Sequence, residues 1–380
     1  MGRYVSSFVK NEFETPGPVE RISQFVLNLP LSLFKHLEDG MPAFRHAHQK
    51  VALVLEQVQI ENGVKEYHHQ FGRRSHSRKA MSRAFVAKAV LNIPTTKDLV
   101  ERLNLDIRLR RICGFCYSVP SESTFSRAFA EFAADGLADQ VHASAVRELL
   151  GSEIVFHASL DAASIPARER GPRKKVIVKK PTKKRGRQQG QRPGERRKAL
   201  SPQEIQLKQS WKEALAELPQ TCDHGCKIGP KGYMQHWRGF KIHAHVGDGG
   251  IPLGLVTTSA SIHDSRVAIP LLRMTASRVG TILYNLMDKG YSGTWIETAS
   301  NELGQVAIVP PKPLTIRGLR PELTPDRKRR YGNRTTVERF FADLKDNHGG
   351  NHLFVKGGAK VHAHLMMGVL AIFGLSVLRL

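Results

Sequence analysis

The sequence predicts an α/β fold in which a mixed sheet is flanked by helices and preceded by a mainly helical N-terminal part. Before residue 150, apolar residues recur with helical spacing. After residue 150, short runs rich in β-branched residues alternate with helical segments, which is typical of a mixed sheet. The chain has 380 residues, of which 41% are hydrophobic, and this is enough for two domains with buried cores. We expect a helical domain over 1–150 and a sheet-containing domain over 151–380.

Three segments before residue 150 have the clearest helical pattern: about 81–93, 96–104 and 121–133. In the last of these, Phe125, Phe129 and Phe132 recur at i, i+4 and i+7 and form one apolar face. The short helices predicted within 95–129 are compatible with a helix-turn-helix that binds DNA. Ordinary helix packing explains the same pattern, and we favour it.

Five apolar runs after residue 150 predict strands: 153–161, 237–246, 251–260, 281–288 and 305–310. The turn residues GDGG join the second and third runs as a hairpin. A helix should follow from Asp264 or Ser265, with Asp264 as its N-cap. The apolar run 365–378 has 14 residues, fewer than the roughly 18 needed to span a bilayer. We therefore expect a buried helix there.

The charge of the chain indicates a polyanionic partner. There are 58 Lys and Arg residues against 34 Asp and Glu residues, which leaves a net charge of +24. Nucleic acid is the leading candidate, ahead of an anionic membrane surface. The segment 168–198 alone holds 15 Lys and Arg residues and 2 Glu residues, and predicts a basic insertion at about 165–200 that binds phosphates. A solvated loop or a nuclear import signal would have the same composition.

The N-terminus and the cysteines favour a cytoplasmic protein. No apolar stretch of signal-peptide length opens the chain, and four cysteines are too few for a disulfide scaffold. The local spacings of Cys113 with Cys116 and of Cys222 with Cys226 are compatible with a zinc site. The two pairs are far apart in sequence and fall in different predicted domains, so we do not favour zinc.

The run YGNRTTVERFFADLKDNHGG, which starts at Tyr331, predicts an amphipathic helix over about 331–346. On a helix of 3.6 residues per turn, four of its polar residues fall within an arc of about 60°. They are Tyr331, Arg334, Glu338 and Lys345. This stripe borders an apolar face formed by Val337, Phe340, Phe341 and Leu344. An ordinary surface helix with an ion pair between Arg334 and Glu338 would have the same spacing.

The spacing Tyr-x2-Arg-x3-Glu-x6-Lys in this run resembles the signature of bacterial insertion-sequence transposases of the DDE superfamily. Other segments resemble motifs of the same family, in the same order. They are PSESTFSRAF, SLDAAS around Asp161, WRGFKIHAHV, SIHDS at 261–265 and LMDKGYSG around Asp288. The resemblance covers about residues 80–375. Two departures are the long basic insertion and the short interval from Asp288 to Glu338, which has no room for the large β-rich insertion of some relatives.

The resemblance implies a ribonuclease-H-like catalytic domain. In such a domain Asp161, Asp288 and Glu338 would converge and hold two divalent ions, Mg²⁺ or Mn²⁺, for cleavage and strand transfer. The residues that would contact DNA are Tyr331, Arg334 and Lys345 of the signature and Lys289 beside the second aspartate. Without metal, three close carboxylates would repel one another and raise the pKa of at least one of them.

The resemblance also implies double-stranded DNA as the partner, both the terminal inverted repeats of the element and the target. The N-terminal domain would bind the element ends, and a homodimer or larger synaptic assembly would join two ends. No membrane contact is expected. Two other functions stay open: a catalytically inactive DNA-binding regulator derived from a transposase, and a metal-dependent nuclease without strand transfer. A purely binding protein has no chemical need for the three acids.

Overall fold

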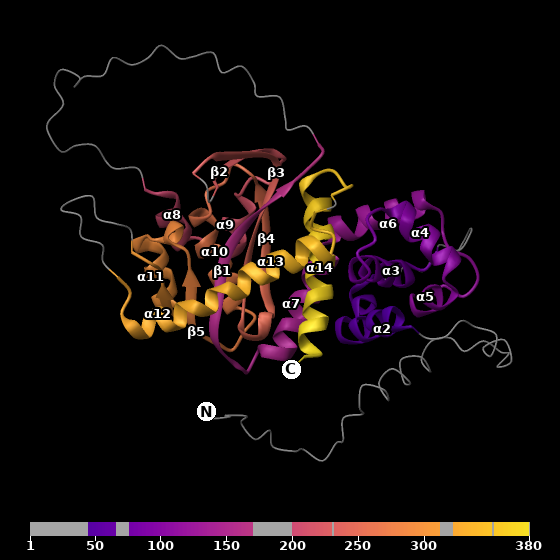
Figure 1. Cartoon of the computed structure of the whole chain (residues 1–380), viewed down its shortest axis with the longest axis horizontal. Coiled ribbons are helices and arrows are strands. Elements are labelled where there is room, and N and C mark those ends of the chain that lie inside the picture. Colours follow the sequence, from indigo (N-terminus) through magenta and orange to yellow (C-terminus); the bar gives the residue numbers. More distant parts are fainter. Residues whose placement is uncertain are drawn as a thin grey trace, which may run out of the picture.

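The computed structural model of the chain describes residues 45–65, 76–169, 200–229, 232–311, 322–351 and 353–379. These residues form a helical part and a sheet part, with the long helix α14 between them (Figure 1). The predicted basic insertion falls mainly on residues 170–199, so this prediction lies outside the described residues.

The helical part confirms the three helices predicted before residue 150. Its elements are α2 (His46–Val58), η2 (Ile60–Gly63), α3 (Arg78–Val90), α4 (Thr96–Leu105), α5 (Ile107–Ile112), α6 (Glu122–Asp135) and α7 (Leu137–Leu150). α4 begins after Thr95, whose hydroxyl accepts a hydrogen bond from the Asp98 backbone at 3.0 Å. Phe125 and Phe129 of α6 pack on the ring of Phe85 in α3, with centroid distances of 5.7 and 4.9 Å. The predicted apolar face of α6 is therefore a core face.

The strands form one mixed sheet, as predicted. They are β1 (Ile154–Pro166), β2 (Asp223–Ile228), β3 (Met234–Val246), β4 (Pro252–Ser259), β5 (Thr281–Met287) and β6 (Val306–Ile308). Their order is β2-β3-β1-β5-β6, with β4 paired to β3. β1 runs antiparallel to β3 and parallel to β5, which in turn is parallel to β6. β3 and β4 are the predicted antiparallel hairpin.

Helices cover both faces of this sheet. They include α8 (Pro202–Lys208), α9 (Trp211–Ala216), α10 (Ser265–Ala276), α11 (Thr294–Glu302) and α14 (Gly358–Val377), together with the 3-10 turns η3 (Asp248–Gly250) and η4 (Lys289–Tyr291). On one face, Leu160 and Met287 pack with apolar residues of α10 and α11. On the other, Ile165 and Ile242 pack with α14 and the helix before it. Because side chains alternate along β1, Asp161 lies on the second face.

The helix predicted over 331–346 is interrupted in the structure. Three elements replace it: α12 (Pro325–Tyr331), the 3-10 turn η5 (Gly332–Arg334) and α13 (Thr335–Asn347). Glycine and asparagine, which open η5, are poor helix formers, and the tighter turn changes the winding of the chain. The prediction of one uninterrupted α-helix is therefore wrong, because Tyr331 ends α12 whereas Glu338 and Lys345 lie on α13.

α14 is the central apolar helix and confirms the buried helix predicted at 365–378. It packs against α2, α3, α6, α7, α13 and β4. Among the described residues it is the one helix long and apolar enough to cross a membrane, and most of its apolar stretch is buried inside the protein. One cluster of buried residues runs from the N-terminal helices through α14 to β3. The division into two domains near residue 150 stays a prediction.

Candidate active site

Asp161 and Asp288 lie side by side where the parallel pair of β1 and β5 stops. Leu160 of β1 is in register with Met287, the last residue of β5, so the aspartates are the next residues along two strands about 4.8 Å apart. The prediction that Asp161 ends its own strand is wrong, because pairing with β3 carries β1 on to Pro166. The prediction for Asp288 is confirmed, since it directly follows β5.

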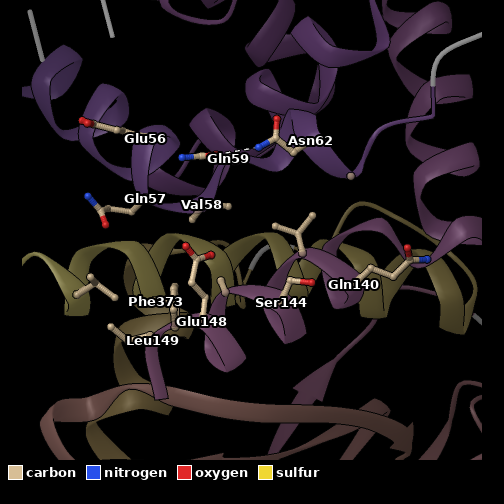
Figure 2. Close-up of a pocket in the computed structure, with 14 residues that line it drawn as sticks. Glu56, Gln57, Val58, Gln59, Asn62, Gln140, Ser144, Glu148, Leu149 and Phe373 are labelled. Atoms are coloured by element: carbon tan, nitrogen blue, oxygen red, sulfur yellow. Dashed lines mark hydrogen bonds between the residues drawn. The ribbon is translucent and has the colours of Figure 1, made fainter. Parts of the chain in front are cut away.

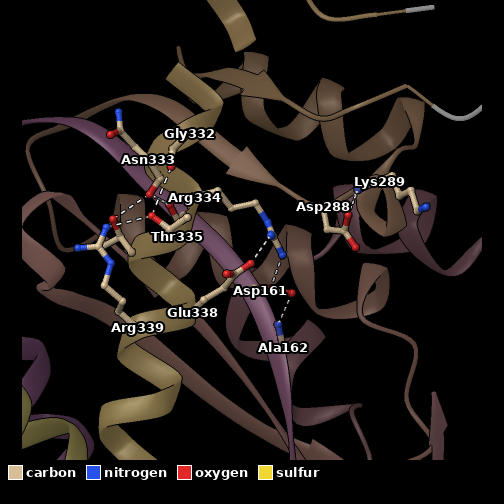
Figure 3. Close-up of polar contacts among 12 residues, drawn as sticks. Asp161, Ala162, Asp288, Lys289, Gly332, Asn333, Arg334, Thr335, Glu338 and Arg339 are labelled. Carbon is tan, nitrogen blue, oxygen red and sulfur yellow. Dashed lines mark hydrogen bonds and ion pairs between the residues drawn. The ribbon is translucent and has the colours of Figure 1, made fainter. Parts of the chain in front are cut away.

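Asp288 begins the turn η4. Its Oδ1 accepts a hydrogen bond from the Lys289 backbone N–H at 2.6 Å, which fixes the carboxylate beside the end of β5. The side chain of Lys289 is exposed and points away from Arg334 (Figure 3). Lys289 therefore lies at the rim of the group of acids and not between them.

Glu338 lies in the first turn of α13 and is linked to Asp161 through Arg334 (Figure 3). Arg334 Nη2 donates to Asp161 Oδ2 at 2.5 Å, and Nη1 donates to Glu338 Oε1 at 2.7 Å. The side chain of Arg334 is 17% exposed, whereas that of Glu338 is 56% exposed. The ion pair expected of an ordinary surface helix is thus present, but the same arginine also holds an aspartate of the central strand.

The electrostatics of the site depend on burial as much as on charge. Burial raises the pKa of Asp161 to about 6; Arg334 opposes this shift, and Asp288 and Asp264 add to it. Burial lowers the pKa of Arg334, but the surrounding acids, Asp161 above all, outweigh it, so that the pKa lies above its usual value. Repulsion among acids raises one carboxyl pKa as expected, although burial is the larger cause.

The other two signature residues lie in different surroundings. Tyr331 is half-buried; burial is the main cause that raises its pKa, and all three predicted acids raise it further, so it lies close to them. Lys345 is two helical turns beyond Glu338, about 10 Å along α13. Burial and the charge of Lys227 on β2 lower the pKa of Lys345. It therefore belongs to a neighbouring part of the surface.

Asp264 is close to these acids, which the sequence did not predict. It occupies the N-cap position of α10 but makes no capping hydrogen bond, and its backbone is already helical, with φ −58° and ψ −39°. A capping side chain is usually presented from an extended backbone, so the predicted capping role is wrong. Asp264 Oδ1 instead pairs with Lys241 Nζ of β3 at 2.9 Å.

Tyr291 is a further residue that the sequence reasoning missed. It is 2% exposed, and its hydroxyl has no hydrogen-bond partner among the described residues. Its ring packs in one cluster with Leu160 and Met287, the residues that precede the two aspartates. Burial raises the pKa of Tyr291 well above its usual value, and nearby acids raise it further. Lys241, Asp264 and Tyr291 each stand in a motif quoted above, but a local motif does not reveal which other motif it meets.

The donor atoms at this site suit a hard cation. Carboxylate oxygens from a strand, a strand end and a helix are the ligands that Mg²⁺ and Mn²⁺ prefer, and Arg334 already places positive charge between two of them. Within the described ranges, no three His, Cys, Asp or Glu side chains are arranged as a complete metal site. The cysteines are free thiols, with Cys113 and Cys222 buried and Cys116 and Cys226 exposed.

A hollow of 710 Å³ lies elsewhere, between α2 and η2 on one side and α7 and α14 on the other (Figure 2). Its lining combines polar side chains such as Gln57, Gln140 and Glu148 with apolar ones such as Leu149 and Phe373. None of the predicted site residues lines it. The junction between the N-terminal helices and α14 is therefore incompletely packed at this point, at a distance from the acids.

A mixed sheet with one aspartate on its central strand, a second at the end of the adjacent parallel strand and a glutamate on a covering helix is consistent with an enzyme that cuts or transfers nucleic-acid strands. The transposase DDE domain family matches residues 159–373, which include all three acids, and a second transposase domain matches residues 35–131. The chain therefore belongs to the transposase DDE family and is an insertion-sequence transposase of the DDE type. No significant match was found among curated proteins or among solved structures.

Family membership establishes the coarse function. The chain is a DNA-binding enzyme of the nuclease and transferase type, and its family generally uses divalent metal ions. The architecture agrees with this assignment, since a mixed sheet flanked by helices is consistent with a ribonuclease-H-like domain.

Proposed function

We propose that this transposase cuts the ends of its insertion sequence and joins the freed 3′ ends to target DNA, with Asp161, Asp288 and Glu338 as its catalytic residues. The observation that carries the proposal is the meeting of three acids from separate elements at the point where β1 and β5 stop pairing (Figure 3). Two of them follow residues paired in register, and the third is tied to the first by one arginine.

The same three acids are the proposed ligands of two Mg²⁺ or Mn²⁺ ions. Such ions would activate a water or a 3′-hydroxyl and stabilise the charge that develops on the oxygens around the phosphorus. Asp161, which is in line with Asp288 and linked to Glu338 through Arg334, would hold the ions together with these two acids. Its carboxylate is held by its own strand, where Oδ1 accepts a hydrogen bond from the Ala162 backbone at 2.8 Å. Asp288 is held in the same manner by Lys289.

The proposed DNA contacts are Tyr331, Arg334, Lys289 and Lys345. Tyr331 and Arg334 are close to the acids, so they would bind phosphates or a displaced base beside the scissile bond. Lys289 and Lys345 lie further out and would bind the backbone on either side. The partner is double-stranded DNA, namely the terminal inverted repeats and the target.

The remaining parts of the chain would serve the same reaction. The N-terminal helices, within 1–150, are proposed to bind the element ends, and the basic insertion at about 165–200 to bind phosphates. Two element ends must be joined, so a homodimer or larger assembly is proposed for the synaptic complex. The protein would act in the bacterial cytoplasm, at the nucleoid.

The substitution Glu338→Gln tests the proposed chemistry. It preserves the shape of the side chain but removes a charged oxygen ligand, so Mg²⁺-dependent cleavage of an element end should fall at least about 100-fold. Binding of the same duplex, measured by fluorescence anisotropy, should be retained. Asp346→Asn is the matched control, because Asp346 lies on the same helix but bonds to Asn351. It should cleave as the wild type does.

Unchanged cleavage by Glu338→Gln would rule out the catalytic assignment. A wild-type protein that binds element ends but does not cut them with either metal would support the alternative, a catalytically inactive DNA-binding regulator. Cut ends without joined products in the presence of target DNA would indicate a nuclease.

A further inference from the structure

Arg334 makes an unusual pair of contacts for a residue proposed to bind DNA. Its two terminal nitrogens are both used inside the protein, one by Asp161 and the other by Glu338. Among the described residues it is the only cation within ion-pair distance of either acid. The two carboxylates therefore share the single positive charge of one side chain, which takes the place that a bound cation would otherwise fill.

The rest of the Arg334 side chain makes no polar contact within the described part of the chain. Its Nε is buried and has no hydrogen-bond partner among the described residues. Its backbone belongs to the three-residue turn η5, between α12 and α13. Gly332, which begins this turn, has open space where a Cβ would lie. The two acids are thus what holds the guanidinium in its present position, and no further polar network has to break when it leaves.

We propose that Arg334 acts as an internal counter-ion, which holds Asp161 and Glu338 until DNA draws it onto a phosphate and so opens these acids to divalent ions. The inference rests on the proposed function, because it takes the two acids as metal ligands. It makes Arg334 a positioning residue with two alternating partners, the acids in the free protein and a phosphate in the DNA complex.

The physical reason is competition for the same oxygens. A divalent ion and a guanidinium repel each other, and Asp161 Oδ2 and Glu338 Oε1 are both already bound to Arg334. In the absence of DNA, a metal ion that binds here has to displace Arg334 and leave its charge without a partner. A phosphate offers an arginine a bidentate contact of comparable strength, so DNA removes this cost.

The coupling between the two ligands is reciprocal. If DNA increases the affinity of these acids for metal, then metal increases the affinity for DNA by the same factor. Couplings of this kind usually change affinities by about 5- to 150-fold. The free protein would then hold few metal ions at its acids, which limits cleavage of DNA that does not engage Arg334.

Mn²⁺ binding to the full-length protein tests this directly, by electron paramagnetic resonance of the free ion. The DNA is a duplex that ends at the element terminus, read from the inverted repeats beside the gene, so that no bond remains to be hydrolysed. Wild-type protein should bind Mn²⁺ at least about 10-fold more tightly with the duplex than without it. In Arg334→Ala, the affinity for Mn²⁺ in the absence of DNA should rise. The ratio of the Mn²⁺ affinity with the duplex to that without it should fall to about 2 or less.

Two further variants serve as a conservative substitution and as a control. Arg334→Lys replaces the two-pronged guanidinium with a single ammonium group, so its ratio of Mn²⁺ affinities should lie between those of the wild type and Arg334→Ala. It should also fold if Arg334→Ala does not. Arg329→Ala removes a neighbouring arginine of α12 that pairs with Asp326 and not with the acids. This control should keep the wild-type ratio. Thermal unfolding of each variant verifies that the proteins compared are folded.

Equal Mn²⁺ affinity of the wild type with and without DNA would overturn the inference. A lower DNA-free affinity in Arg334→Ala would also overturn it, because Arg334 would then only order the acids. Neither outcome affects the proposed function, which fails separately if Glu338→Gln cleaves normally or if no Mn²⁺ binds to the wild-type DNA complex.

Discussion

Asp161 carries its charge on the central strand, where burial opposes ionisation and raises its pKa. Arg334 offsets this burial and at the same time holds Glu338. Because the pKa of Arg334 is itself raised by the acids, it stays charged wherever the protein is folded. These residues depend on one another, since replacing one leaves a partly buried charge without its partner.

A second ion pair gives a residue-scale dependence on pH. His362 Nε2 of α14 lies 2.8 Å from Asp139 Oδ1 of α7, and its Nδ1 lies 2.9 Å from Thr257 Oγ1. Burial lowers the pKa of His362, but the charge and hydrogen bond of Asp139 outweigh this, and the pKa is raised above 6.5. The stabilisation is therefore present below pH 6.5 and is lost as the pH rises through the folded pKa.

As the pH rises from about 6 to 8, the stability of His362→Gln should fall less than that of the wild type. The midpoint of urea unfolding measures this stability. The other charged groups near Asp139 do not titrate there, because Arg278 stays charged and burial lowers the pKa of His142 to about 4. His236→Gln, on an exposed part of β3, is the control and should follow the wild type. Equal pH dependence of His362→Gln and wild type would contradict a titrating contact.

At the scale of elements, the position of Glu338 depends on how closely α13 packs on α14. Gly368 of α14 lies at this contact: a Cβ added there would be 2.6 Å from Leu344 Cδ1 and 2.7 Å from His348 O. A backbone oxygen cannot move aside as a side chain can. The absence of a side chain at Gly368 therefore sets the distance between the two helices, and with it the height of Glu338 above the sheet.

Gly368→Ala should destabilise the protein by about 1–3 kcal/mol, because overpacking against the backbone exceeds the gain in helix propensity. Gly374→Ala is the matched control on the same helix, where the added Cβ would be 3.1 Å from Val54 Cγ1 and 3.4 Å from Val54 Cα, both longer than the distances at Gly368. Urea unfolding of both variants measures the difference. Equal stabilities would contradict a close contact at Gly368.

At the scale of the whole molecule, the net charge of +24 attracts DNA before any specific contact forms. Much of this charge is concentrated between Arg168 and Lys198. Arg168 itself stacks over the ring of Phe354, and Glu169 accepts a hydrogen bond from the Gly357 backbone. A test of the basic insertion should therefore keep these two anchoring residues.

Replacing residues 170–199 with a neutral Gly/Ser segment of equal length should flatten the salt dependence of DNA binding. For each phosphate that the protein no longer neutralises, the slope of log Kobs against log salt concentration should become shallower by about 0.9. A variant with the same residues in shuffled order preserves the charge and should keep the wild-type slope. An unaltered slope in the neutral variant would mean that the insertion does not bind phosphates.

Local patterns in the sequence determined most of the secondary structure. Periods of 3.6 and 2 report which side of a segment is buried, so α3, α6, the β3–β4 hairpin and β5 could be predicted from them. The resemblance to a family marked the three acids and the arginine. Composition indicated DNA as the partner. None of these features required knowledge of which segments meet.

Tertiary structure decided which of these residues act together. The register of β1 against β5 places Asp161 beside Asp288, and the packing of η5 and α13 on β1 lets Arg334 reach Asp161 as well as Glu338. The packing of α10 on β3 brings Asp264 to Lys241, with which it pairs in place of capping its helix. Strand register and helix contacts depend on the simultaneous burial of distant segments, whereas a pattern along one segment reports only its own environment.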